Sequence, residues 1–391
     1  MTHSTGRPEY QTLMKIIRLI LFWALWYLAF SSRTVVSPLL PLIQNSLSLN
    51  QASAGGLYLF MAGGSTLAVL LAGHIALKIG YKRLILISFW LLAAMLFAFS
   101  QADSFWAISA TLLFTGVAGG LYLPCAIPML TATFERNDWG KAISFHETAA
   151  GFSLLSVPFI IALLLGTVHW RTIFVLMATA TALTTITFWV LTPNPLPERT
   201  RSMPVIVLLR RIDFWVILIL WVSCGMLSMG VYNIIPLFLV NEKGMLLEQA
   251  NRIFSLSRIG GFVGQVAIGF FLDRYSTRTL LGVLTAASGV FTIAAAVTVT
   301  HWLLIVMLLL QATFCVVFFP VGIVAIAKVT RSEERGVFTG TIMAVSGMLG
   351  IGVTPFLLGA IADAWSFQSG FIILGLLSLA ICPLAGLLRN V

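Results

Sequence analysis

The sequence predicts an all-α membrane protein whose twelve transmembrane helices form two parallel six-helix repeats. Three observations lead to this fold class. Of the 391 residues, 59% are hydrophobic and only 9% are charged, whereas an average soluble domain has about 25% charged residues. The apolar runs have about 20 residues or more, the length that a helix needs to cross a bilayer core of ~30 Å. Finally, sequence features recur at a spacing of half the chain.

Short polar connections separate the predicted spans. Their ranges are 18–44, 53–77, 83–101, 104–133, 141–166, 170–192, 213–240, 249–272, 279–298, 301–328, 337–362 and 367–388. One longer polar segment, rich in Pro and Arg, follows the sixth span. We therefore expect an N-terminal six-helix bundle at 1–192, a cytoplasmic linker at 193–212 and a C-terminal six-helix bundle at 213–391.

A basic loop that contains glycine follows the second span and returns after the eighth, with Gly73 and Gly269 lying 196 positions apart. The same spacing joins Lys78 with Arg274, Lys82 with Arg278, Pro124 with Pro320, Gly140 with Gly336 and Gly151 with Gly347. A fixed spacing over this length indicates two copies of one unit. Because each copy has an even number of helices, the two copies run parallel through the membrane.

Lys and Arg are distributed unevenly between the two ends of the spans. The end with Lys15 and Lys78 collects 18 of the 23 basic residues, whereas the other end has only Arg171, Lys243 and Arg252. Because short loops rich in Lys and Arg remain in the cytoplasm, we expect both termini there and the chain in a plasma (bacterial inner) membrane. This distribution accounts for the net charge of +10 without a nucleic-acid partner.

The helix count, the parallel halves, the central cytoplasmic loop and the two basic loops together resemble the major facilitator superfamily. The family's loop motif runs approximately Gly-x-Leu-Ala-Asp-Arg-x-Gly-Arg-Arg. The resemblance implies gating residues in these loops, at Lys78, Asp273 and Arg274. Leu77 replaces the family's Asp in the first copy, so we expect Asp273 to supply the cytoplasmic latch, at a helix N-terminus where the dipole favours negative charge.

Two departures from the family bear on function. Leu112 stands near the position where many proton-driven members carry an Arg, and the segment from Gly151 to Pro158 lacks the Gly-Pro pair of drug/proton antiporters. Both departures weaken a multidrug-export interpretation. Residues 32–41 and 145–149 look more like branches that carry nitrate, nitrite, cyanate or organic acids.

Ionisable groups inside the hydrocarbon point to the site, because each costs from ~2.5 kcal/mol upward at the middle of a span. Arg33 and Arg258 lie 15 residues from Arg18 and Asp273, respectively. At 1.5 Å per residue, both arginines are roughly 22 Å from the cytoplasmic edge. We expect them to face a shared cavity and bind an anion, since a guanidinium matches carboxylate, phosphate or nitrate. The alternative is that each Arg only pins neighbouring helices.

Glu147 lies six residues after Lys141 and is a candidate proton carrier, because burial favours a neutral carboxyl group. A structural salt bridge is the alternative. The adjacent His146 points ~100° away from Glu147, so at most one of the two faces the cavity, and a structural role is the commoner one for such a histidine. Polar neutral side chains complete the candidate substrate site, namely Tyr232, Asn233, Tyr122 and Gln311.

These features predict a secondary transporter that moves a small organic or inorganic anion by alternating access, with proton symport preferred and exchange or uniport as alternatives. A second hypothesis is proton-coupled efflux of amphipathic or cationic compounds, with Glu147 as the counter-charge; a third is a non-transporting sensor. We expect a monomer in the lipid bilayer, a small-molecule substrate and protons as partners, and no enzyme activity, cofactor or metal. The four cysteines have neither metal-ligand nor disulfide spacing.

Overall fold

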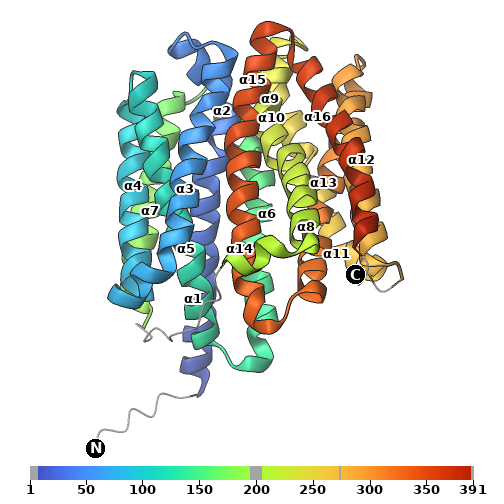
Figure 1. Ribbon diagram of the computed structural model, residues 1–391. Coiled ribbons are helices and arrows are strands. Elements are labelled where there is room, and N and C mark those ends of the chain that lie inside the picture. Colours follow the sequence, from blue (N-terminus) through green and yellow to red (C-terminus); the bar gives the residue numbers. More distant parts are fainter. Residues whose placement is uncertain (1–7, 194–204, 273, 389–391) are drawn as a thin grey trace, which may run out of the picture.

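The computed structural model describes residues 8–193, 205–272 and 274–388, and all regular structure in this part of the chain is helical. The first group of helices comprises α1 (Pro8–Thr34), α2 (Val36–Ser46), α3 (Gln51–Ile79), α4 (Tyr81–Gln101), α5 (Phe105–Thr133), η1 (Arg136–Asp138), α6 (Trp139–Leu164) and α7 (Trp170–Leu191). The second group comprises η2 (Val205–Arg210), α8 (Ile212–Gly225), η3 (Met226–Gly230), α9 (Val231–Asn241), α10 (Leu247–Leu256), α11 (Ile259–Leu272), α12 (Thr277–Val297), α13 (His301–Val329), α14 (Ser332–Ser346), η4 (Gly347–Val353), α15 (Thr354–Ala364), α16 (Phe367–Ile381) and η5 (Cys382–Leu387). Figure 1 shows these helices side by side in one bundle, with α1 starting at its lower end.

Eleven helical stretches in the described residues are long and apolar enough to cross a membrane, against twelve predicted. The predicted span 249–272 differs, because α10 and α11 are separated at Ser257 and Arg258 and each is too short to cross alone. The Ser257 hydroxyl donates to the Phe254 carbonyl at 2.7 Å, a local bond that competes with the helical one. Gly260 and Gly261 follow at once and further weaken helix formation.

Two other predicted spans change helix type in the middle. The span at 213–240 contains the π-helical turn η3 between α8 and α9, and the span at 337–362 contains the π-helical turn η4 between α14 and α15. The two turns touch through backbone, since a Cβ added at Gly230 in η3 would lie 2.8 Å from the carbonyl oxygen of Gly350 in η4. Single π turns inside α-helices occur frequently at functional sites.

Local sequence signals set several helix ends. Asn50 begins α3 by accepting a hydrogen bond from the Ser53 amide at 2.9 Å. Gly80 separates α3 from α4 with φ of +89°, a backbone conformation that side chains with a Cβ seldom adopt. The reversal within the first basic loop therefore depends on glycine. Of the predicted linker, residues 194–204 lie outside the described part of the chain, and Val205–Arg210 form the 3-10 turn η2.

Helices α3 and α5 approach each other closely through small residues. A Cβ added at Gly64 would lie 2.0 Å from the Leu113 carbonyl oxygen, and one added at Gly116 would lie 2.0 Å from the Met61 carbonyl oxygen. Any larger residue at either position would force the two backbones apart. Small residues at helix interfaces are typical of membrane proteins, where close van der Waals packing replaces the hydrophobic effect between helices.

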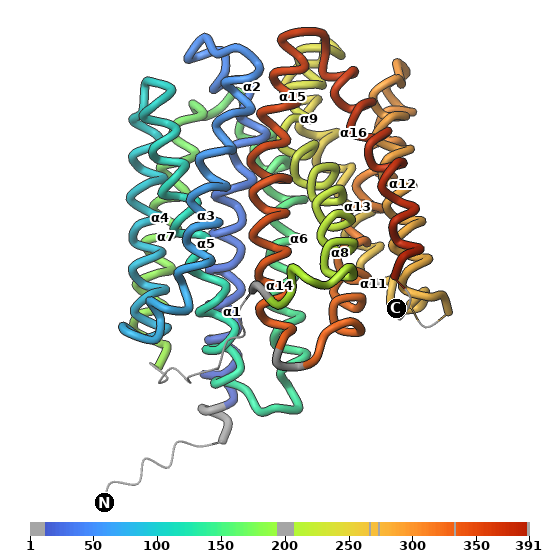
Figure 2. The backbone as a smooth tube through the Cα atoms, in the orientation of Figure 1, coloured from blue at the N-terminus to red at the C-terminus, as the bar shows by residue number. Residues whose placement is uncertain are grey.

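The two groups of helices are joined toward the upper end of the bundle as drawn in Figure 2, where α3 and α15 run side by side. A Cβ added at Gly359 would lie 2.2 Å from the Gln51 carbonyl oxygen, so these helices touch through backbone. Nearby, the Asn241 amide donates to the Gln44 side chain at 3.2 Å, and the Ser37 hydroxyl donates to the Tyr232 carbonyl at 2.9 Å. The upper end is thus closed by direct contacts between the first and second groups.

Candidate functional site

Arg33, in the last turn of α1, points into the first group of helices. Its Nη2 atom donates to the Ser65 hydroxyl on α3 at 3.2 Å, and its Nε atom is buried without a hydrogen-bond partner. The guanidinium also lies against Gly119 on α5, where an added Cβ would be 2.7 Å from Nη2. Arg33 therefore packs its guanidinium against the α5 surface at Gly119.

Arg258 lies at the interruption between α10 and α11 and is only 5% exposed. Its Cζ atom lies 4.8 Å from the ring centre of Tyr232 on α9 and 5.1 Å from that of Phe254 on α10. Aromatic rings attract a cation through their negative faces, an interaction of about 0.5–2 kcal/mol that strengthens as water is excluded. The two rings thus hold the guanidinium in place without neutralising its charge.

One edge of the Arg258 guanidinium has no protein partner. Both Nε and Nη2 are buried without a hydrogen bond, and so is the hydroxyl of Tyr232. These two nitrogens lie on the same side of the planar group, where a carboxylate can accept two parallel hydrogen bonds. A buried unpaired charge is costly, so the geometry fits an anionic group that arrives from outside the protein.

Arg33 and Arg258 make their contacts in different groups of helices. The partners of Arg33 are on α3 and α5, whereas those of Arg258 are on α9 and α10. Sequence reasoning matched the two residues by depth and could not give the direction of either side chain. In the structure each guanidinium is held within its own group.

The amides of Gln311 and Asn233 are engaged by the π-helical turns. Gln311 Nε2 on α13 donates to the Leu227 carbonyl in η3 at 2.8 Å, and Asn233 Nδ2 donates to the Ile351 carbonyl in η4 at 3.4 Å. A π turn leaves carbonyls without their usual helical partners, and these side chains supply hydrogen bonds there. Gln311 Oε1 remains buried without a partner. Sequence reasoning found both amides but not the π turns, because no local pattern announces them.

In the first group, Tyr122, His146 and Glu147 form one hydrogen-bonded chain. The Tyr122 hydroxyl on α5 donates to the Phe22 carbonyl of α1 at 2.8 Å and lies 3.0 Å from His146 Nε2 on α6. His146 Nδ1 lies 3.1 Å from Glu147 Oε1. The His146 side chain is fully buried, while that of Glu147 is 47% exposed. The indole of Trp26 stacks on the His146 ring with 5.8 Å between ring centres.

The structure describes two of the three predicted gating residues. Lys78, in the last turn of α3, and Arg274, in the turn after α11, are both exposed, and Asp273 lies outside the described residues. Their gating role stays a prediction. The turn at Gly80 is the part of the loop motif whose geometry is visible.

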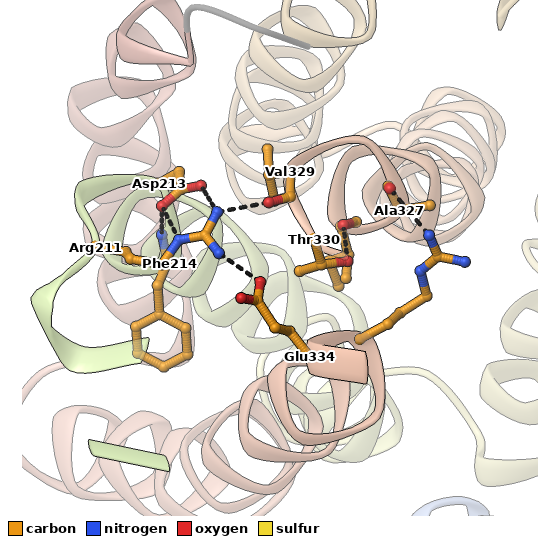
Figure 3. Close-up of polar contacts among 9 residues, drawn as sticks. Arg211, Asp213, Phe214, Ala327, Val329, Thr330 and Glu334 are labelled. Carbon is orange, nitrogen blue, oxygen red and sulfur yellow. Dashed lines mark hydrogen bonds and ion pairs between the residues drawn. The ribbon is translucent and has the colours of Figure 1, made fainter. Parts of the chain in front are cut away.

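A charged cluster at the lower end of the second group was not singled out from the sequence (Figure 3). Arg211 pairs with Asp213 at 2.6 Å and with Glu334 at 2.8 Å, and its Nη2 atom also donates to the Val329 carbonyl at 2.5 Å. The hydrogen bonds that Arg211 donates to Asp213 raise the pKa of Arg211. These contacts fasten the start of α8 to the connection between α13 and α14.

Positions 196 apart make equivalent contacts at the lower end of the first group. Lys15 corresponds to Arg211 by that spacing and pairs with Glu135 at 3.4 Å. Trp139 Nε1 donates to the Thr131 carbonyl at 2.9 Å, and Arg335 Nη2 donates to the Ala327 carbonyl at 3.2 Å (Figure 3). The spacing relates Lys15 to Arg211, but the position 196 residues after Glu135 is Arg331 rather than Glu334.

Membrane-length helices with ionisable groups in their interior define an integral membrane transport protein. A family profile described as Major Facilitator Superfamily matches residues 22–281 and 248–391, and the chain belongs to that family. It is a transporter rather than an enzyme, as the family resemblance in the sequence predicted.

Curated relatives include the 4-hydroxybenzoate transporter PcaK of Pseudomonas putida, which is 31% identical over 161 residues, or 41% of this chain and 33% of that protein. PcaK of Pseudomonas aeruginosa is 30% identical over 159 residues, covering 39% and 34%. The match thus spans about a third of the length of these relatives.

Solved transporters share the fold at low sequence identity. The nucleoside transporter NupG has a TM-score of 0.79 at 15% identity, with 97% of this chain and 99% of that chain covered. A bacterial homologue of the human lysosomal transporter Spinster, in an inward-facing and unoccupied conformation, has a TM-score of 0.76 at 14% identity, covering 98% and 96%.

Proposed function

We propose that this protein imports a small organic anion together with protons by alternating access. In this proposal α10 and α11 together form one span, the eighth in chain order, which brings the total to twelve. Two parallel six-helix repeats at 1–192 and 213–391 then flank the linker at 193–212. The repeat is supported by Trp139 and Arg335, which lie 196 positions apart and donate to the carbonyls of Thr131 and Ala327, also 196 positions apart. The protein works as a monomer.

The lower end of the bundle is proposed to face the cytoplasm of a bacterial inner membrane. This end carries most of the Lys and Arg residues of the short connections, and such residues remain on the cytoplasmic side. The upper end, where α3 packs against α15, is then external and closed. The structure therefore corresponds to an inward-facing state, in which substrate leaves toward the cytoplasm.

The observation that carries the substrate proposal is the unpaired edge of Arg258. Its Nε and Nη2 atoms are buried and free to donate to both oxygens of a carboxylate. The rings of Tyr232 and Phe254 beside it favour an acid with an aromatic or otherwise flat body. The name of the PcaK relatives supports the same substrate class, since 4-hydroxybenzoate is an aromatic carboxylate.

The remaining predicted residues have supporting roles in this proposal. Arg33 provides positive charge in the first group, at the junction of α1 with α3 and α5. Asn233 and Gln311 hold the π turns η4 and η3, and the free Oε1 of Gln311 can accept a hydrogen bond from a substrate hydroxyl group. Glu147 with His146 carries the proton, since Glu147 is partly exposed and bonded to the buried ring.

A second candidate is proton-coupled efflux of amphipathic or cationic compounds. It is favoured by the aromatic surface near Glu147, where Phe145 and Phe152 are exposed and both contact Trp23. A cation would then bind the carboxylate of Glu147 and stack on these rings.

Uptake into proteoliposomes with a pH gradient distinguishes the two functions. With the outside acidic, the proposal predicts accumulation of radiolabelled 4-hydroxybenzoate above its external concentration. Collapse of the gradient with a protonophore should abolish this accumulation and leave exchange of internal for external substrate. The efflux function predicts instead gradient-driven movement of a lipophilic cation such as tetraphenylphosphonium, without 4-hydroxybenzoate transport. That second pattern would reject the anion-import proposal.

A further inference from the structure

Tyr122 ties the buried His146 ring to the backbone of α1, and this contact determines where hydrogens reside. The Tyr122 hydroxyl lies 2.8 Å from the Phe22 carbonyl oxygen and 3.0 Å from His146 Nε2. A carbonyl oxygen only accepts hydrogen bonds, and a phenol has one hydrogen to donate. When that hydrogen points to Phe22, the Tyr122 oxygen must accept from His146. Nε2 therefore carries a hydrogen.

A hydrogen on Nε2 also determines how Nδ1 of His146 bonds to Glu147. His146 Nδ1 lies 3.1 Å from Glu147 Oε1, a hydrogen-bond distance that requires one hydrogen between the two atoms. With Nε2 already protonated, this hydrogen belongs either to an imidazolium facing a carboxylate or to a carboxylic acid facing a neutral imidazole. Both descriptions contain the same number of protons. The arrangement in which the Tyr122 hydroxyl donates to Phe22 is thus the proton-loaded state of the His146–Glu147 pair.

After one proton has left, a second arrangement still provides hydrogen bonds for Tyr122, His146 and Glu147. Nδ1 keeps a hydrogen and donates to the Glu147 carboxylate, while Nε2 becomes an acceptor. The Tyr122 hydroxyl then turns from Phe22 to His146. Loss of one proton therefore breaks the hydrogen bond between α5 and α1 and reverses the direction of the one between α5 and α6.

Other ionisable groups on the helices that pack against α6 have partners of their own. On α1, Lys15 pairs with Glu135, Arg18 donates to the Leu191 carbonyl, and the Tyr27 hydroxyl lies 3.0 Å from that of Ser156. On α6 itself, Lys141 pairs with Asp138. Arg252 on α10 pairs with Glu248, and Arg258 packs on Tyr232 and Phe254. Cys125 on α5 is a buried free thiol. Arg33 on α1 donates to Ser65, so among the described residues Tyr122 is the ionisable side chain that bonds directly to His146 from another helix.

We propose that Tyr122 is a positioning residue that makes His146 and Glu147 a one-proton site and links proton binding to the contact between α1 and α5. The inference rests on the proposed proton coupling and assigns its switching element. In the loaded state the Tyr122 hydroxyl takes part in two hydrogen bonds, and in the unloaded state in one. Tyr122 therefore stabilises the proton-loaded state of the His146–Glu147 pair.

The test compares Tyr122→Phe with Tyr27→Phe in proteoliposomes. Tyr27 is a matched control because its hydroxyl also connects two helices, α1 and α6, but its partner Ser156 does not titrate. The probe is radiolabelled 4-hydroxybenzoate, with accumulation measured over a series of external pH values and counterflow measured without a gradient. Tyr122→Phe should move the pH midpoint of accumulation down by about half to one unit, the equivalent of one neutral hydrogen bond. Counterflow should remain within about twofold of wild type, because it needs no net proton movement.

Tyr27→Phe should keep the wild-type midpoint. Intact counterflow in Tyr122→Phe with an unchanged midpoint would overturn the inference, and so would an equal shift in Tyr27→Phe. If neither wild type nor variant transports 4-hydroxybenzoate, the proposed function fails instead, and a readout without substrate decides on Tyr122.

That readout is the ¹⁵N NMR signal of His146 in purified protein labelled at its five histidines, assigned with His146→Gln. In wild type we expect Nε2 to carry a hydrogen below the midpoint and to lose it above, while Nδ1 keeps its hydrogen. The same midpoint should fall in Tyr122→Phe. Retention of the Nε2 hydrogen above the midpoint in wild type would refute the switch even if the variant failed to fold.

Discussion

Asp363, near the end of α15, accepts a hydrogen bond at 2.9 Å from the backbone amide of Gln51, the first residue of α3. Its second carboxylate oxygen accepts from the Ala52 amide at 2.8 Å. One carboxylate of the second group thus caps a helix of the first, where amides without helical partners and the helix dipole both favour negative charge. The family's loop motif places such an Asp at the other end of these helices, where this chain has Leu77.

Replacement of Asp363 by Ala should loosen the closed upper end. Loss of a helix cap costs about 1 kcal/mol, or roughly a fivefold increase in local opening. Hydrogen exchange followed by mass spectrometry should show faster exchange in the peptide that begins at Gln51. Glu242→Ala serves as the matched control, because Glu242 caps Phe367 and Gln368 within the second group. Faster exchange at Gln51 in the Glu242 variant, or none in the Asp363 variant, would contradict a specific latch.

Alanine at two glycines of α5 should have different effects on stability. At Gly116 the new Cβ would meet the Met61 backbone at 2.0 Å, whereas at Gly119 it would meet the flexible end of Arg33 at 2.7 Å. Overpacking against backbone costs about 1–3 kcal/mol. We expect Gly116→Ala to lower the melting temperature of the purified protein clearly and Gly119→Ala to change it little. Equal melting temperatures would show that α3 and α5 are less tightly packed than described.

Removal of Glu334 should weaken the lower end of the second group. Arg211 and Glu334 are mostly shielded from solvent, with side chains 29% and 15% exposed, and share a network with Asp213. The corresponding Lys15–Glu135 pair is more exposed, and such pairs contribute about 0–1 kcal/mol. Glu334→Gln should therefore lower the melting temperature more than Glu135→Gln does. The opposite order would mean that the cluster in Figure 3 does not fasten α8.

Neutralisation of Glu147 should separate proton coupling from substrate movement. Glu147→Gln cannot exchange a proton with His146, so accumulation driven by an acidic exterior should fall at least tenfold, while counterflow of 4-hydroxybenzoate persists. Glu135→Gln is again the control, because Glu135 is highly exposed. Accumulation at the wild-type level in Glu147→Gln would remove this residue from the coupling mechanism.

The sequence was informative wherever one physical property acts over a long stretch. Hydrophobic length located the spans, and the 196-residue spacing related the two basic loops that begin at Gly73 and Gly269. Interruptions were not predicted, because they arise from packing. The π turns η3 and η4 accompany the contact of Gly225 with Gly350, and the break at Ser257 and Arg258 lies inside a segment long enough to cross the membrane as one helix.

For the site residues, the sequence predicts the depth of a residue in the membrane but not the direction of its side chain. Residue spacing gave similar depths for Arg33 and Arg258, but the direction of each side chain depends on Gly119 for one and on Tyr232 for the other. Likewise, helical geometry separated His146 from Glu147 by ~100°, yet side-chain rotation brings Nδ1 and Oε1 to 3.1 Å. The spacing also could not show that Tyr122, which is expected at the substrate site, contacts His146.

The central claim is that the free edge of Arg258 receives a carboxylate. Its most direct test is equilibrium binding of 4-hydroxybenzoate and of the uncharged 4-hydroxybenzamide to purified wild type, Arg258→Lys and Arg252→Lys. Lysine keeps the charge at position 258 but lacks the planar pair of donors. Arg252 is an exposed arginine on α10, the helix that ends just before Arg258. We predict that wild type and Arg252→Lys bind the acid at least tenfold more tightly than the amide, and that Arg258→Lys loses this preference. Full preference for the acid in Arg258→Lys would contradict the account.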